Sequence, residues 1–209
     1  YADPFIDLNG EEITFKNGYG PDVFTDFILD FIEEKKDDPF FVYYPMALTH
    51  DPFVPTPDSS EWDGDRMKKS NKHFKDMVEY MDKVVGQIVA KLDDLGLRDD
   101  TLVIFTGDNG TKNSITTRMT DGRRIRGDKG QPTDGGTRVP LIANWPGVIK
   151  PNQINDNLID FSDFLPTITE LTNAKLPADR KLDGRSFLHQ LKGEPGDVRE
   201  WVFCHYDPK

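Results

Sequence analysis

Hydrophobic positions along the chain follow a helical pattern in two segments. Between Asp22 and Ile32, apolar residues recur at spacings of three and four, which places them on one face of a helix. The segment Lys72–Leu95 repeats this pattern over a longer span, and the Gly96 that follows it is a typical helix stop. The pattern therefore predicts two amphipathic helices in the first half of the chain.

Three shorter apolar runs predict buried strands at Phe40–Tyr44, Leu102–Phe105 and Val139–Asn144. The longer predicted helix lies between the first two runs, and a strand, a helix and a strand in succession are typical of a parallel βαβ unit. We therefore expect an α/β fold with a mostly parallel central sheet flanked by helices. No linker-like composition divides residues 1–209, so a single domain is expected.

Shorter elements are expected near both ends of the chain. A small β excursion is expected around Ile13–Phe15, between two Asn-Gly turns. The segment Asp160–Thr172 predicts a helix that starts near Ser162–Leu165, because Pro166 belongs in the first turn of a helix. A last strand is expected at Trp201–Tyr206.

Charge is unevenly distributed over the sequence. The formal net charge of −11 argues against general nucleic-acid binding, because most of the surface would repel a phosphate backbone. The segment Thr111–Arg138 differs, since it carries seven Lys or Arg residues against three Asp residues, a local balance of +4. A cationic loop on an acidic protein is expected to receive an anion, although a solvated surface loop has the same composition.

Several other types of site and segment are excluded. No stretch approaches the roughly 18 unbroken apolar residues of a membrane span, so none is expected. The single cysteine, Cys204, excludes an intramolecular disulfide, and its neighbour His205 would point to the opposite face of a strand. The segment Gly122–Gly130 lacks the Gly-Lys-Ser/Thr ending of a phosphate-binding loop, which excludes a nucleotide site of that kind.

Polar side chains follow two of the predicted strands directly. Asp108 and Asn109 lie just past Leu102–Phe105, and His50 lies just past Phe40–Tyr44. Ligands of open α/β sheets bind at the carboxyl ends of strands, and carboxylate and carboxamide oxygens suit Ca²⁺ or Mg²⁺. Two alternatives stay open at this point. Asp-Asn-Gly is also ordinary turn chemistry, and a histidine in a loop is often only a surface residue.

Four ordered segments resemble the sulfatases of the alkaline phosphatase superfamily. They are DPFFVYYPMALTHDPFVP, VGQIVAKLDDLGLRDDTLVIFTGDNG, RGDKGQPTDGGTRVPLIANWPGVI and IDFSDFLPTITELTNAKLPADRKLDGRSF, and together they extend from about Gly18 to Phe187. Several motifs in the right order are more specific than any one of them.

The resemblance implies a role for four residues. Asp108 and Asn109 match the Asp-Asn-Gly whose side chains ligate a single divalent cation, usually Ca²⁺, with Mg²⁺ as the alternative. His50 matches a histidine that contacts the sulfate ester and helps the leaving oxygen, and Lys129 matches a lysine that binds sulfate oxygens. Related phosphodiesterases and phosphatases tend to have Asp-His where this sequence has Asp-Asn, so the resemblance favours a sulfate ester over a phosphate ester as the substrate. A Thr-Asp-Gly-Gly stands where the family has Glu-Gly-Gly, which is a mild departure.

Part of the family's machinery has no counterpart in this sequence. Sulfatases use a formylglycine made from a Cys-x-Pro-Ser-Arg segment and further metal aspartates from an earlier strand, and Cys204 does not match that segment. We therefore expect this chain to be the central-to-late part of a sulfatase catalytic domain, an incomplete fold in which 201–209 enter the C-terminal subdomain. Alone, it is expected to have no sulfatase activity.

The resemblance also implies a substrate and a compartment. The expected partner is a sulfated small molecule or sulfated carbohydrate, and the expected compartment is periplasmic, secreted or lysosome-like. Asn109-Gly110-Thr111 is a glycosylation acceptor, so a bacterial source or an unmodified sequon is expected, since a glycan would occupy the metal ligand. The alternatives are a phosphate or phosphonate ester hydrolase of the same superfamily and a non-catalytic anion- or calcium-binding module.

Overall fold

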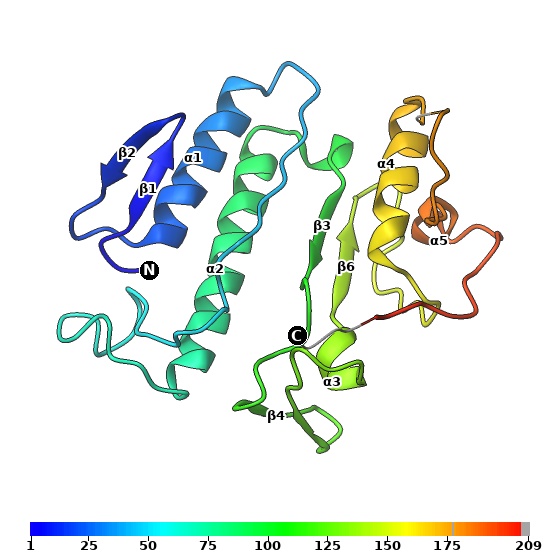
Figure 1. Cartoon of the computed structure of the whole chain (residues 1–209). Helices are drawn as coiled ribbons and strands as arrows, with labels where there is room; N and C mark the ends of the chain where they lie inside the picture. Colours follow the sequence, from blue (N-terminus) through cyan, green and yellow to red (C-terminus); the bar gives the residue numbers. More distant parts are fainter. Residues whose placement is uncertain (177, 206–209) are drawn as a thin grey trace. The chain divides into compact units, whose positions relative to one another are not determined.

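The computed structural model describes residues 1–176 and 178–205 (Figure 1). The chain forms two compact units, Tyr1–Arg98 and Asp99–Lys209. Each unit has its own helices, strands and buried side chains.

The first unit opens with a two-stranded hairpin. Strands β1 (Phe5–Leu8) and β2 (Glu11–Thr14) pair antiparallel, and the predicted Asn-Gly turn joins them. The β excursion expected around Ile13 is thus confirmed as β2. Its partner β1 has only four residues and no regular alternation of burial, which is why its sequence carries no strand signal of its own.

Helices α1 (Gly20–Glu34) and α2 (His73–Asp94) confirm the two helical patterns and pack against each other (Figure 1). A proline stands in the first turn of α1, where its missing N–H costs no hydrogen bond. The side chains buried on α1 and α2 recur at helical spacing, and they include Ile28, Ile32, Met77, Tyr80, Val84 and Leu92.

The end of α2 agrees closely with the sequence. Gly96 adopts a φ of 68°, and its N–H donates to the carbonyl oxygen of Asp93 at 3.0 Å. The N–H of Leu97 donates to the carbonyl oxygen of Leu92 at 2.9 Å. These two bonds are the Schellman motif, which satisfies carbonyl groups left open at a helix end. A short 3₁₀ turn (Arg98–Asp100) follows.

The predicted strand at Phe40–Tyr44 is not formed in the part of the chain that the structure describes. Its side chains still alternate between half-buried and exposed, and Phe41 and Tyr43 are 69% and 78% exposed. A strand requires a backbone partner as well as an apolar pattern, and no strand pairing among the described residues includes this segment.

Strands β3 (Val103–Thr106) and β6 (Leu141–Asn144) confirm the other two predicted strands. They pair antiparallel, with Val103 opposite Asn144 and Thr106 opposite Leu141. All strand pairings among the described residues are antiparallel, so the mostly parallel central sheet is not confirmed. An apolar run predicts that a strand is buried, but the path of the chain decides which strand it meets and in which direction.

The rest of the second unit consists of short elements. Strands β4 (Thr116–Arg118) and β5 (Arg124–Arg126) form a hairpin within the basic segment, and α3 (Asp134–Thr137) follows it. The sequence pattern did not predict this hairpin, because its exposed strands have no apolar face. The part of the chain described in the structure contains no helix long and apolar enough to cross a membrane.

The predicted helix near Ser162–Leu165 is confirmed. A 3₁₀ turn (Phe161–Asp163) leads into α4 (Phe164–Thr172), with its proline in the first turn. Helix α5 (Leu188–Lys192) packs on α4, where the rings of Phe164 and Phe187 meet edge to face at 5.5 Å. Residues 201–205 form no strand, and Tyr206, the end of the last predicted strand, lies outside the described residues.

Candidate active site

Asp108 and Asn109 lie in the bend that directly follows β3, as the sequence predicts. The Asp108 side chain is exposed and Asn109 is half-buried. Neither side chain has a hydrogen-bond partner among the described residues, so their oxygen atoms are open to a ligand. A carboxylate beside a carboxamide is a donor set that fits a hard cation such as Ca²⁺, although two protein ligands alone would hold it weakly.

The bend is held in place by direct backbone contact with α3. The N–H of Gly110 donates to the carbonyl oxygen of Gly136 at 2.8 Å. A Cβ on Gly110 would overlap the carbonyl group of Gly135, and a Cβ on Gly136 would overlap the carbonyl oxygen of Gln131. Only glycine allows backbones to approach this closely. The Thr-Asp-Gly-Gly segment therefore has a structural role, which is to fix the turn that carries Asp108.

Lys129 is brought to the same loop cluster through its backbone. Its N–H donates to the carbonyl oxygen of Thr111 at 3.0 Å, two residues beyond Asn109. The neighbouring N–H of Asp128 donates to the carbonyl oxygen of Gly135 at 3.0 Å. The Lys129 side chain itself is exposed. The structure thus joins the segments that bear Asp108, Asn109 and Lys129, three of the four predicted site residues.

The cluster contains donor types that suit a cation and donor types that suit an anion. Asp108 and Asn109 offer oxygen ligands, and Lys129 offers an exposed ammonium group on a segment that the backbone bond to Thr111 joins to theirs. Residues 3–174 match the model of the sulfatase family. The chain belongs to the sulfatase family. The family resemblance seen in the sequence is therefore confirmed.

Relatives of this sulfatase chain include vertebrate enzymes. It is 34% identical to rat steryl-sulfatase over 184 residues, covering 85% of this chain and 30% of that protein. It is 35% identical to human arylsulfatase A over 172 residues, covering 82% of this chain and 32% of that protein. The crystal structure of Ps i-CgsB in complex with k-i-k-neocarrahexaose matches with a TM-score of 0.74 at 27% identity. The match covers 89% of this chain and 41% of that one. The chain spans about a third of the length of these curated relatives.

His50, the fourth predicted residue, lies in the first unit of the sulfatase chain. Its exposed ring is oriented locally, because Nδ1 donates to the carbonyl oxygen of Asp51 at 2.7 Å. A carbonyl only accepts, so Nδ1 carries a proton, and Nε2 is the ring nitrogen that remains available to another group. The Tyr1 hydroxyl lies 2.6 Å from the carbonyl oxygens of Ala47 and His50. Burial and the charge of Asp51 raise the pKa of Tyr1 to about 12, so this hydroxyl stays a donor.

A further group of potential ligands in the first unit was not anticipated from the sequence. Glu61, His73 and Asp76 offer ligand atoms that all lie within 4.8 Å of one another. The set of one nitrogen and two carboxylates suits Zn²⁺ better than Ca²⁺. The signal in the sequence was a His and an Asp three residues apart at the start of a helix, which places both on one face.

Members of this group also bond to one another and to their neighbours. The fully buried His73 lies 3.0 Å from Asp76, which also accepts a hydrogen bond from Ser59 at 2.9 Å. Lys72 pairs with Glu61. Burial acts to raise the pKa of Asp76, but the bonds from His73 and Ser59 hold it below its usual value. This network connects the loop before α2 to the first turn of that helix.

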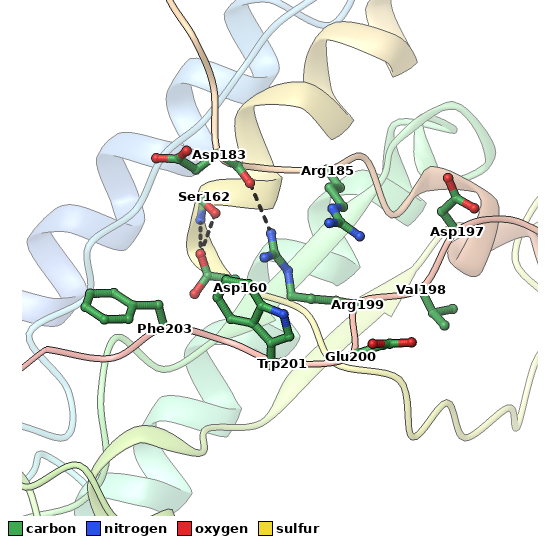
Figure 2. A pocket seen from close by; sticks show the side chains of 10 residues that line it. All are labelled: Asp160, Ser162, Asp183, Arg185, Asp197, Val198, Arg199, Glu200, Trp201 and Phe203. Carbon is green, nitrogen blue, oxygen red and sulfur yellow. Dashed lines mark hydrogen bonds between the residues drawn. The ribbon is translucent and has the colours of Figure 1, made fainter.

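A pocket of about 720 Å³ lies in the second unit, beside the start of α4 (Figure 2). Four acidic side chains, two arginines, Trp201 and Phe203 contribute to its lining, and none of the predicted site residues does. Figure 2 shows the Arg199 guanidinium directed toward the carbonyl oxygen of Asp183, which it reaches at 3.5 Å. Arg199 is also paired with the buried Asp163, so it stabilises the wall of the pocket.

The glycine contacts behind the site can be tested by substitution. Gly136→Ala is expected to lower the free energy of unfolding by about 1–3 kcal/mol, because the added methyl group must displace the backbone around Gln131. Thermal unfolding of the complete protein measures the change. Gly86→Ala is the matched control, since Gly86 lies in α2 with open space at its Cβ. Gly86→Ala is expected to raise the free energy of unfolding by about 0.5–1 kcal/mol. Equal effects of the two substitutions would contradict the close backbone contact.

Proposed function

We propose that the complete protein hydrolyses sulfate esters with the loop cluster of Asp108, Asn109 and Lys129. We assign the role of acid to His50 because it matches the histidine of the family motif. The observation that carries the proposal is the backbone contact that joins the Asp-Asn-Gly turn to the Lys129 segment in a chain of the sulfatase family. Sulfated compounds are the substrate class, either a small molecule or a carbohydrate. The carbohydrate option is supported by the neocarrahexaose complex of the similar structure.

Each residue has a separate part in the proposed reaction. Asp108 and Asn109 hold a divalent cation, Ca²⁺ or Mg²⁺, which supplies charge neutralisation for the sulfate oxygens. The Lys129 ammonium group donates to a non-bridging sulfate oxygen and stabilises the charge that develops there. A formylglycine, which the family uses as nucleophile, has no counterpart among the residues of this sequence.

His50 is the proposed donor to the leaving oxygen. Its Nδ1 proton is held by the Asp51 carbonyl oxygen, so the proton given to the leaving oxygen comes from Nε2 of the imidazolium form, and the ring is left neutral. The Tyr1 hydroxyl stabilises the conformation of this loop through the carbonyl of His50. We propose a periplasmic, secreted or lysosome-like compartment for the reaction, with the Asn109 sequon unmodified because a glycan would block the cation.

The test compares two aryl esters and removes the metal. The complete protein is expected to hydrolyse 4-nitrophenyl sulfate faster than 4-nitrophenyl phosphate. Treatment with EDTA should abolish sulfate turnover, and Ca²⁺ in excess should restore it, because the cation neutralises charge in the transition state. Nitrophenolate release at fixed pH measures both.

Two outcomes would overturn the proposal. Faster phosphate turnover would assign the site to a phosphate ester hydrolase of the superfamily. Tight Ca²⁺ binding without turnover of either ester would assign it to a non-catalytic calcium-binding module. Calorimetric titration with Ca²⁺ separates that second outcome from a protein that has simply lost its metal.

A further inference from the structure

The basic segment next to the site forms a hairpin with an arginine-rich face. In the pairing of β4 with β5, Arg118 stands opposite Arg124 and Thr116 stands opposite Arg126. Opposed residues and residues two apart along a strand share one face of a sheet. Arg118, Arg124 and Arg126 therefore project from the same face, called here the arginine face, and all three are exposed.

The charges on this face are not balanced within the fold. Arg126 donates through Nε to the carbonyl oxygen of Asn113 at 2.8 Å. Off the face, Arg123 is paired with Asp121 at 2.6 Å. Among the described residues, Arg118 and Arg124 have no hydrogen-bond or ion-pair partner, although they are directly opposed. Like charges directly opposite each other destabilise a strand pair, so the fold gains nothing from this arrangement.

An anion bound between the two guanidinium groups would replace their mutual repulsion with attraction. A guanidinium group presents a planar fork of donors that matches a sulfate or carboxylate group in bidentate geometry. Two opposed forks that have no acidic partner among the described residues therefore match one such group in charge and donor geometry. The overall charge of −11 disfavours a nucleic acid as the source of this anion, because the rest of the surface would repel its backbone.

The hairpin is directly attached to the proposed active site. At its base the N–H of Gly127 donates to the carbonyl oxygen of Ile115 at 3.0 Å, and the N–H of Lys129 donates to that of Thr111 at 3.0 Å. Figure 1 shows the β4 hairpin and α3 at the same end of β3. A substrate with one sulfate at Lys129 and a second anionic group farther along its length can therefore extend onto the arginine face.

We propose that Arg118 and Arg124 bind a second anionic group of the substrate, which makes the preferred substrate a sulfated glycan with at least two anionic groups. This inference rests on the proposed sulfatase activity and adds the substrate class to it. Arg126 lies on the same face, and its bond to Asn113 holds the base of the hairpin in position.

The test uses a disaccharide with two sulfate groups and its monosulfated counterpart as substrates of the complete protein. The wild type is expected to prefer the disulfated compound in kcat/KM. The double variant Arg118→Gln/Arg124→Gln is expected to reduce that preference roughly tenfold or more, the effect of losing at least one charge-assisted hydrogen bond, mainly through a higher KM. Added salt should reduce the wild-type preference and leave that of the variant nearly constant.

Arg123→Gln is the matched control, because Arg123 lies off the arginine face and is paired within the hairpin. Its preference ratio should equal that of the wild type. An unchanged ratio in the double variant, with an unchanged unfolding temperature, would overturn the subsite. A double variant that binds single-stranded DNA more weakly than the wild type, but binds the glycan equally well, would also overturn the subsite.

Failure of this inference is distinguishable from failure of the proposed function. If the wild type hydrolyses neither disaccharide nor 4-nitrophenyl sulfate, the sulfatase proposal fails. Calorimetric titration with the disulfated compound then still tests the subsite, since binding to the arginine face requires no turnover. Weaker binding by the double variant than by Arg123→Gln supports the subsite, and equal binding overturns it.

Discussion

Asp108→Ala is expected to lower kcat/KM of the complete protein toward 4-nitrophenyl sulfate by roughly 10²–10³-fold, the loss typical for one charge-stabilising group in an active site. The carboxylate is exposed and has no partner among the described residues, so its removal costs the fold little. What it removes is the charged ligand of the proposed cation, and the remaining carboxamide of Asn109 is neutral.

The role as a ligand predicts a second effect that a merely structural residue would not have. In Asp108→Asn, the Ca²⁺ concentration for half-maximal activity should rise, and excess Ca²⁺ should restore part of the rate. Asp156→Ala, at another exposed aspartate of the second unit, should change neither quantity. Full activity of Asp108→Ala after EDTA treatment and Ca²⁺ titration would show that Asp108 is only a turn residue, the alternative that its sequence left open.

Asp163→Ala is expected to lower the free energy of unfolding by about 3–5 kcal/mol, the cost of breaking a buried ion pair by removal of one partner. Asp163 is 3% exposed and pairs with Arg199. It also accepts hydrogen bonds from the backbone N–H groups of Arg185 at 2.7 Å and Asp160 at 2.8 Å. Its loss would leave Arg199 and two backbone donors without their acceptor beside the pocket of Figure 2.

Chemical denaturation of the variant and the wild type measures this change. Arg123→Ala breaks an exposed pair with Asp121, and it should cost less than about 1 kcal/mol. A loss at Asp163 no larger than that of this surface pair would mean that the C-terminal segment around Arg199 does not stabilise the second unit.

The same pair predicts a pH dependence of stability. Burial acts to raise the pKa of Asp163, but the bonds from Arg199, Arg185 and Asp160 outweigh it and hold the pKa below its usual value. Such a group contributes stability that is present above the unfolded pKa of about 3.9 and is lost as pH falls through the folded pKa. The difference in unfolding free energy between wild type and Asp163→Asn should therefore shrink as pH falls below about 4.

Local patterns in the sequence determined the elements that depend on local physics. Helix α2 and its end at Gly96 follow from apolar spacing and from the preference of glycine for positive φ. The proline in α4 indicated where that helix begins. The family, too, was readable from ordered motifs, and with it the candidate roles of Asp108, Asn109, Lys129 and His50.

Only the tertiary structure decided the features that depend on which backbones meet. The antiparallel pairing of β3 with β6 and the absence of a strand at Phe40–Tyr44 among the described residues depend on pairing partners, which an apolar run does not specify. The contact of Gly110 with Gly136 shows why those glycines are needed, which their sequence alone does not. The opposition of Arg118 and Arg124 follows from strand register, because a shift by one residue would move one of them to the other face.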